Sequence, residues 1–147
     1  MKPLNKKIVA TSYGICTVKG FDTEEYMNNL EQSENLTNAV SIDNEQLNTT
    51  LKKYKGINPR RMDRLSKIAM VASANCLEKS GLEVTEEKLS EIGGVFCTTY
   101  GPIASSRDFM LTGFKNGLEA ASPIIFPYTV CNAVSGVITL FMKVRGF

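Results

Sequence analysis

Four cysteines are the side chains of this sequence best suited to covalent catalysis: Cys16, Cys76, Cys97 and Cys131. A cysteine becomes a good nucleophile when a histidine, a cation or a helix N-terminus stabilises its thiolate. The chain contains no histidine, which excludes a Cys–His or Ser–His pair formed by this chain alone. The cysteines are also widely spaced and form no CxxC pair, so we expect free thiols, no metal site and no cofactor.

The overall composition is that of an ordinary globular domain. The 147 residues carry 17 Lys and Arg against 15 Asp and Glu, a net charge of +2, which indicates neither nucleic acid nor an anionic membrane as a partner. No apolar run is long enough to cross a membrane. The apolar stretch near the N-terminus is short and is interrupted at residues 12–14, so we expect no signal peptide and a cytoplasmic location.

Two short apolar segments predict buried β-strands. They are Lys7–Tyr13, which is β-branched and precedes a glycine, and Gly94–Thr98. Helical patterns lie between and after them, so the predicted fold class is α/β. Two strands are few for a layered fold, because a parallel sheet needs several strands with helices on both faces. We therefore expect part of a sheet whose next strands lie elsewhere.

The helices that would position these strands differ in character. Residues 15–57 are rich in Asn, Glu and Gln and predict a polar surface excursion with short helices capped by Asp22 and Asp43. The clearest helix is expected over Asn58–Leu82, with Pro59 in or near its first turn. Further helices are expected after Thr85, after Ser105 or Ser106, and over 132–144. The predicted buried face of the 58–82 helix comprises Leu65, Ile68, Ala69, Ala72, Cys76 and Leu77.

Three motifs, in this order, resemble the N-terminal part of the β-ketoacyl synthase (condensing enzyme) family. They are PRRMDRLSKIAMVAS at 59–73, GVFCTTYGP at 94–102 and SPIIFPYTVCNAVSG at 122–136. The resemblance covers Ile8–Gly14 and Asn58–Phe147. It implies that residues 1–147 form an incomplete thiolase-like half domain, with helices layered on a small mixed sheet.

In the family that this chain resembles, an acyl group passes from a thioester to a cysteine. Malonyl thioester then loses carbon dioxide, and its carbanion attacks the acyl group in fatty acid or polyketide synthesis. The family's nucleophile lies in a TAC-type motif that this sequence lacks, and the catalytic histidines are also absent. Cys131 occupies a small-residue position of a TVxNAxxG motif, which is not the nucleophile's position. We therefore assign no catalytic residue and expect this chain alone to be inactive.

The resemblance also implies binding roles. The turn at 100–103 resembles the border of the family's acyl tunnel, and the segment from Thr129 onwards resembles one near the dimer interface. Implied partners are acyl carrier protein or an acyl thioester, and a ketosynthase-type chain in a homo- or heterodimer. The resulting acyl-pocket or interface candidates are Tyr100, Pro102, Ile103, Phe126, Thr129, Val130, Cys131 and Asn132.

A basic cluster at the start of the 58–82 helix has two interpretations. Arg60, Arg61, Asp63 and Arg64 resemble a family cluster that is structural, and we favour an ion network that organises the helix start. The alternative is a site for a phosphate or for an acidic carrier protein.

Three readings of the whole chain remain open. It is a fragment of a full synthase, or a non-catalytic partner subunit that completes another chain's ketosynthase site, or a binding module without acyl chemistry.

Overall fold

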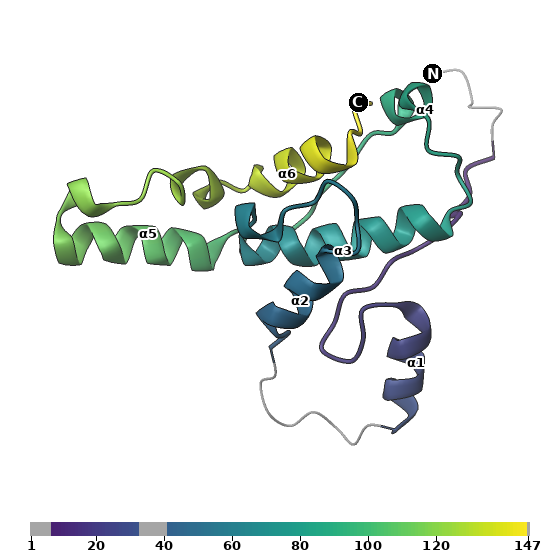
Figure 1. The fold of residues 1–147 in the computed structure, drawn as a ribbon, viewed down its shortest axis with the longest axis horizontal. Helices are drawn as coiled ribbons and strands as arrows, with labels where there is room; N and C mark the ends of the chain where they lie inside the picture. The colour runs from purple at the N-terminus through teal and green to yellow at the C-terminus, as the bar shows by residue number, and fades with distance from the viewer. Residues whose placement is uncertain (1–6, 33–40, 147) are drawn as a thin grey trace.

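The computed structural model describes residues 7–32 and 41–146, and the described residues are helical with extended connections (Figure 1). The long helix α3 crosses the centre, and α2 and α6 pack against it (Figure 1). The elements are α1 (Thr23–Gln32), α2 (Asn44–Leu51), the 3-10 helix η1 (Pro59–Arg61), α3 (Arg64–Lys79), α4 (Glu86–Glu91), α5 (Ile103–Asn116), the 3-10 helices η2 (Leu118–Ala120) and η3 (Phe126–Thr129), and α6 (Ala133–Met142).

Side-chain caps start three of the described helices where the sequence places them. Asp22 Oδ1 accepts the backbone N–H groups of Glu24 and Glu25 at the start of α1. Asp43 caps α2 and Thr85 caps α4 in the same way. These caps satisfy N–H groups that have no partner within the helix.

The helix expected over Asn58–Leu82 is divided in two. Pro59 opens η1, in which the Asn58 side chain accepts the N–H of Arg60 at 3.1 Å. The backbone of Met62 is then extended, and Asp63 caps α3 by accepting the N–H of Ser66 at 3.1 Å. Two polar caps, Asn58 and Asp63, therefore start two helices where the periodicity indicates one.

The core lies where α2, α3 and α6 meet. Leu47 and Leu51 of α2 and Met70 and Val71 of α3 are completely buried. From α6, Val134, Val137 and Ile138 close the other side, and Phe21 and Met62 complete the cluster. The polar segment 15–57 therefore supplies three core side chains. Its boundaries as a surface excursion stay a prediction, and its residues 33–40 lie outside the described residues.

The buried face predicted for α3 is wrong by part of a turn. The buried positions are Ser66, Met70, Val71, Ala74 and Asn75. The predicted face is only half-buried. Its first half packs at the edge of the core, and its second half, Ala72, Cys76 and Leu77, borders an apolar groove. Because two of the buried side chains, at positions 66 and 75, are polar, a hydrophobicity pattern does not identify the true buried face.

The small mixed sheet is not confirmed. Across the described residues there is no strand, and the only bridge joins Thr17 to Gly20. Lys7–Tyr13 and Gly94–Thr98 are extended, yet neither has a neighbouring strand to bond with, and Val95 is 94% exposed. A strand needs such a neighbour, because its backbone N–H and C=O groups point sideways.

The first extended segment is nevertheless packed tightly on α3. The Ser12 hydroxyl donates to the carbonyl of Cys76 at 2.7 Å. A Cβ atom at Gly14 would lie 1.9 Å from the carbonyl oxygen of Ala72, so only glycine allows the backbone to approach this closely. Residues 12–14 are thus held against the helix.

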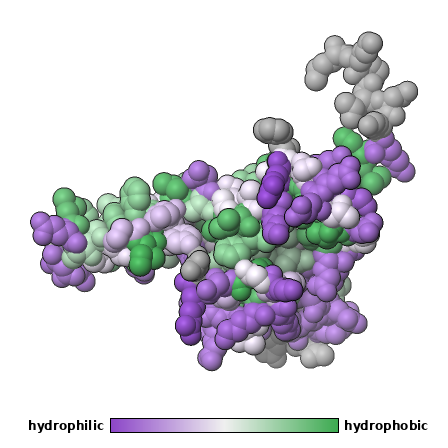
Figure 2. Space-filling model, turned by 45° about the horizontal axis from the view of Figure 1, so that its top comes forward, coloured by the Kyte–Doolittle hydropathy of each residue, from purple (hydrophilic) through white to green (hydrophobic). Residues whose placement is uncertain are grey.

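A helical arm formed by α5, η2 and η3 extends to the left of the body in Figure 1. None of its residues in α5, η2 or η3 is buried. Hydrophobic side chains lie along the arm in Figure 2. The exposed apolar side chains of the arm include Phe114 (79% exposed) and Leu118 (87% exposed). No helix within the described ranges is both long enough and apolar enough to cross a membrane.

Candidate functional site

The predicted acyl-pocket residues come from two segments that meet at the root of the arm. The first is the turn into α5 with the first half of that helix, and the second is η3 with the turn into α6. Two contacts join them: the Ser106 hydroxyl donates to the carbonyl of Thr129 at 3.1 Å, and the rings of Phe109 and Phe126 lie 5.7 Å apart. These contacts bring candidate side chains that are distant in sequence onto one surface where α5 meets η3, which we call the candidate patch.

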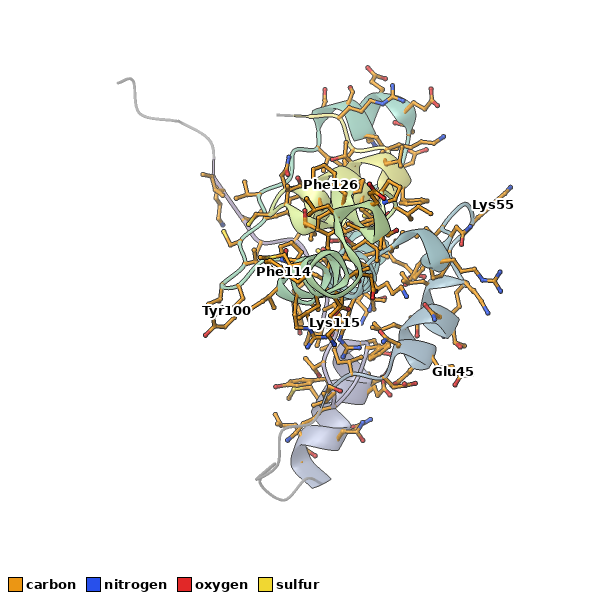
Figure 3. The ribbon with its side chains drawn as sticks, turned by 90° about the vertical axis from the view of Figure 1, so that its left-hand side faces the viewer. Glu45, Lys55, Tyr100, Phe114, Lys115 and Phe126 are labelled. Atoms are coloured by element: carbon orange, nitrogen blue, oxygen red, sulfur yellow. The ribbon has the colours of Figure 1, made fainter. Side chains whose placement is uncertain are left out.

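The turn before α5 is closed by its own polar groups. The backbone N–H of Gly101 donates to the Thr98 hydroxyl at 3.1 Å, and Gly101 has a φ of 58°, which favours glycine. Pro102 is buried at the N-cap position of α5, so this helix begins earlier than the predicted cap at Ser105 or Ser106. Tyr100 is 78% exposed and points away from the body in Figure 3.

The second segment faces that turn through Cys131. A Cβ atom at Gly101 would lie 3.0 Å from Cys131 Sγ, so the thiol sits against the turn. Cys131 is an exposed free thiol, and among the described side chains none hydrogen-bonds to it. Thr129 donates to the carbonyl of Phe126 at 2.8 Å, and Asn132 makes no side-chain cap for α6.

The patch is open rather than enclosed. Ile103, Phe126 and Val130 are all exposed. A cavity of about 520 Å³ lies next to it between η1 and the arm. That cavity is lined by neighbours of the candidates, including Ser105 and Tyr128, and by Arg60 and Asp63 of the basic cluster.

The basic cluster connects helix starts through hydrogen bonds. Arg64 donates to the side chain of Asn44 at 2.9 Å and to the carbonyl of Ile42, which ties the start of α3 to the start of α2. Asp63 serves as the α3 cap. Among the described side chains, neither Asp63 nor Arg60 takes part in an ion pair, and the side chain of Arg61 lies outside them.

The cluster belongs to a longer basic run that the sequence reading did not single out. Residues 52–67 contain seven of the 17 Lys and Arg residues and one acid, Asp63, so they carry +6 while the rest of the chain carries −4. Burial lowers the pKa of Lys67, and the nearby Arg64 lowers it further, against an opposing effect of Asp63. A simple count of charges along the chain finds this run.

The remaining cysteines show no catalytic arrangement. Burial raises the pKa of the Cys16 thiol to about 11, against a smaller opposing effect of Arg64. Cys76 lies 3.3 Å from the Ser12 hydroxyl, and Cys97 is exposed. No group of three or more Cys, Asp or Glu side chains in the described ranges is placed to hold a metal ion.

The sequence reading also missed two side chains that hold the candidates. Ser106 and Phe109 lie one turn apart on α5 and contact η3. Their three-residue spacing places them on one face of a helix, but the sequence offers no signal that this face meets residues 126–129.

Comparison with known proteins defines the class to which this fold and patch belong. Residues 5–147 match the family model described as Beta-ketoacyl synthase, N-terminal domain. The chain therefore belongs to the β-ketoacyl synthase family, and this membership implies a thiolase-like fold.

Two curated relatives carry the same printed name, 3-oxoacyl-[acyl-carrier-protein] synthase 2. The protein from Vibrio cholerae serotype O1 is 26% identical over 129 residues, which cover 88% of this chain and 25% of the relative. The protein from Vibrio harveyi is 28% identical over 87 residues, which cover 59% of this chain and 21% of the relative. The chain thus matches a quarter or less of the length of these relatives.

Proposed function

We propose that this chain is the N-terminal part of a condensing acyltransferase. The completed enzyme would join an acyl thioester to a malonyl thioester in fatty acid or polyketide synthesis. The observation that carries the proposal is the family match over residues 5–147, together with two relatives named as acyl-carrier-protein synthases. The chain would supply structure and part of the substrate site, and other polypeptide would supply the nucleophilic cysteine and the histidines.

The acyl-pocket role falls on the patch at the root of the arm. Its support is the contact between the two candidate segments through Ser106 and Thr129, and through Phe109 and Phe126. Because the patch is apolar and open, further polypeptide would have to cover it before it could enclose an acyl chain. The candidates in this role are Tyr100, Pro102, Ile103, Phe126, Thr129, Val130, Cys131 and Asn132.

The carrier-protein role falls on the basic run 52–67. A net charge of +6 over sixteen residues suits an acidic carrier protein, because complementary charge speeds encounter and orients the partners. Arg60 is exposed in this run and also lines the cavity beside the candidate patch. The hydrogen bonds of Arg64 instead support the structural interpretation of that residue.

The partner role falls on the arm. Exposed apolar side chains on both sides of the turn between α5 and η3 favour a homo- or heterodimer with a ketosynthase-type chain. In the completed enzyme, segments 7–13 and 94–98 would be strands of a mixed thiolase-like sheet. Cytoplasmic location is also part of the proposal, and four free thiols support it.

A condensation assay tests the central claim. The purified 147-residue chain is incubated with acyl and malonyl thioesters, alone and with the remaining three-quarters of the Vibrio cholerae synthase as a separate chain. We expect no β-ketoacyl product from the chain alone. Product formed by this chain alone contradicts the assignment of the nucleophile and histidines to other polypeptide.

The second candidate function is a non-catalytic subunit or binding module that completes another chain's ketosynthase site. The exposed arm is the observation that favours it, since its unburied apolar side chains would suit a partner chain. Co-purification with a ketosynthase chain that already has its own cysteine and histidines would support this alternative. A binding module without acyl chemistry would show no change in melting temperature with carrier protein or long-chain thioesters.

A further inference from the structure

The Ser106 hydroxyl on α5 bonds to a distant segment and not to its own helix. A serine or threonine within a helix commonly donates to the carbonyl three or four residues earlier. Thr112, further along α5, does this, because its hydroxyl donates to the carbonyl of Asp108 at 2.7 Å. Ser106 instead donates to the carbonyl of Thr129, 23 residues later in the chain, at 3.1 Å. Its bond therefore joins two segments of the arm.

This bond holds one end of the segment 129–132. The Thr129 carbonyl lies at the end of η3, where carbonyl groups have no partner within the helix. The carbonyls of Val130 and Asn132 accept N–H groups in the first turn of α6, each at 3.1 Å. The segment is therefore fixed at one end by the start of α6 and at the other by Ser106.

The second contact between α5 and η3 constrains their alignment less. The rings of Phe109 and Phe126 lie 5.7 Å apart, and the burial of apolar surface has little directional preference. A hydrogen bond is directional, because it weakens steeply once its angle falls below about 120°. The Ser106 hydroxyl therefore determines where Thr129 lies along α5.

The position of this segment also sets the width of the candidate patch. Cys131 faces the turn before α5, since its Sγ lies 3.0 Å from the place of a Cβ atom on Gly101. Ser106 is close to the same turn, because α5 begins at Ile103. Movement of residues 129–132 away from Ser106 would therefore widen the gap between Cys131 and the turn.

We propose that Ser106 is a positioning residue for the alkyl chain of the acyl substrate. Its hydroxyl holds Val130 and Cys131 at a fixed distance from the turn at 100–103, so that an extended alkyl chain lies between them. This inference rests on the proposed function, and it names the side chain that determines which acyl chains fit the candidate patch.

Alkylation of Cys131 in the purified chain tests the proposal. N-ethylmaleimide and N-dodecylmaleimide are compared below the micellar concentration, and mass spectrometry follows Cys131 and, as an internal reference, the equally exposed Cys97. The measured quantity is the dodecyl-to-ethyl rate ratio at Cys131 divided by the same ratio at Cys97. We expect this quotient to exceed one in the original chain. Ser106→Ala should lower it by about two- to tenfold, the range for the loss of one hydrogen bond.

Two further variants separate positioning from a general loss of stability. Ser106→Thr keeps the hydroxyl and should restore the quotient of the original chain. Thr112→Ala removes a hydroxyl bond within α5 and should leave the quotient unchanged. An unchanged quotient in Ser106→Ala overturns the proposal, as does an equal fall in Thr112→Ala or in Ser106→Thr.

The same measurement distinguishes this inference from the proposed function. A quotient of one in the original chain contradicts the acyl-pocket role of the candidate patch, and with it the role of Ser106. A quotient above one that Ser106→Ala does not change contradicts the positioning role only.

Discussion

Replacing Asn75 with alanine should destabilise the whole domain. The side chain is buried on α3 and bonds to two other segments. Its amide group donates to the carbonyls of Phe21 and Ile15, and its Oδ1 accepts the Tyr54 hydroxyl at 2.8 Å. Asn75→Ala removes all three bonds, which hold residues 15–21 and the turn after α2 on the central helix.

The size of the effect follows from how each partner is buried. Phe21 is buried, so its carbonyl loses its partner with little access to water, at a cost of about 1–3 kcal/mol. The half-buried Tyr54 hydroxyl can turn to water, which limits its loss to about 0.5–1.5 kcal/mol. The bond to Ile15 is long, at 3.4 Å, and adds little. We expect a loss of about 2–4 kcal/mol in the free energy of unfolding.

Urea denaturation followed by circular dichroism measures this loss. With a slope of about 2 kcal/mol per molar urea, the midpoint should fall by about 1–2 M. The control is Asn28→Ala on the exposed surface of α1, which should change the stability by less than about 0.5 kcal/mol. In a Tyr54→Phe background, Asn75→Ala should cost about 1 kcal/mol less. A midpoint for Asn75→Ala equal to that of the control would refute the reasoning.

Three further predictions use the same kinds of measurement. Asp63→Ala removes the α3 cap and should lower the free energy of unfolding by about 1 kcal/mol in urea; an unchanged midpoint would contradict this. With iodoacetamide at about pH 8.5, Cys16 should react more slowly than the exposed Cys97, because burial raises its pKa to about 11, and mass spectrometry should show the difference vanish in urea. Equal rates for the two thiols in the folded chain would contradict the buried environment of Cys16. Leu47→Ala should cost about 2–5 kcal/mol and Leu118→Ala less than about 0.5 kcal/mol, and similar losses would place the core elsewhere.

The sequence predicted local features of the fold well, because they depend on a few neighbouring residues. Asp22, Asp43 and Thr85 each cap the helix that follows them. The buried face of α3 depends instead on which helices pack against it, and the buried Asn75 is recognisable only once Tyr54 and Phe21 are placed beside it. The expected strands likewise depend on neighbours that a local pattern does not contain.

For the candidate site, too, the sequence predicted local motifs but not tertiary contacts. Motifs identified the family, and that assignment is confirmed by the match over residues 5–147. The turn at Gly101 meets Cys131, and Ser106 meets Thr129 across 23 residues. These are tertiary contacts that no local spacing predicts. The roles of these residues stay predictions, since no ligand contact tests them.

Two glycines with opposite surroundings set how freely this chain can vary in sequence. At Gly14 any side chain would collide with the backbone of α3, since a Cβ atom would come within 1.9 Å of the carbonyl oxygen of Ala72. At Gly136, inside α6, a Cβ atom would meet nothing within 4 Å. A saturation library selected for folding should therefore return glycine alone at position 14. At position 136 it should enrich alanine, which is more favourable than glycine in a helix by about 1 kcal/mol.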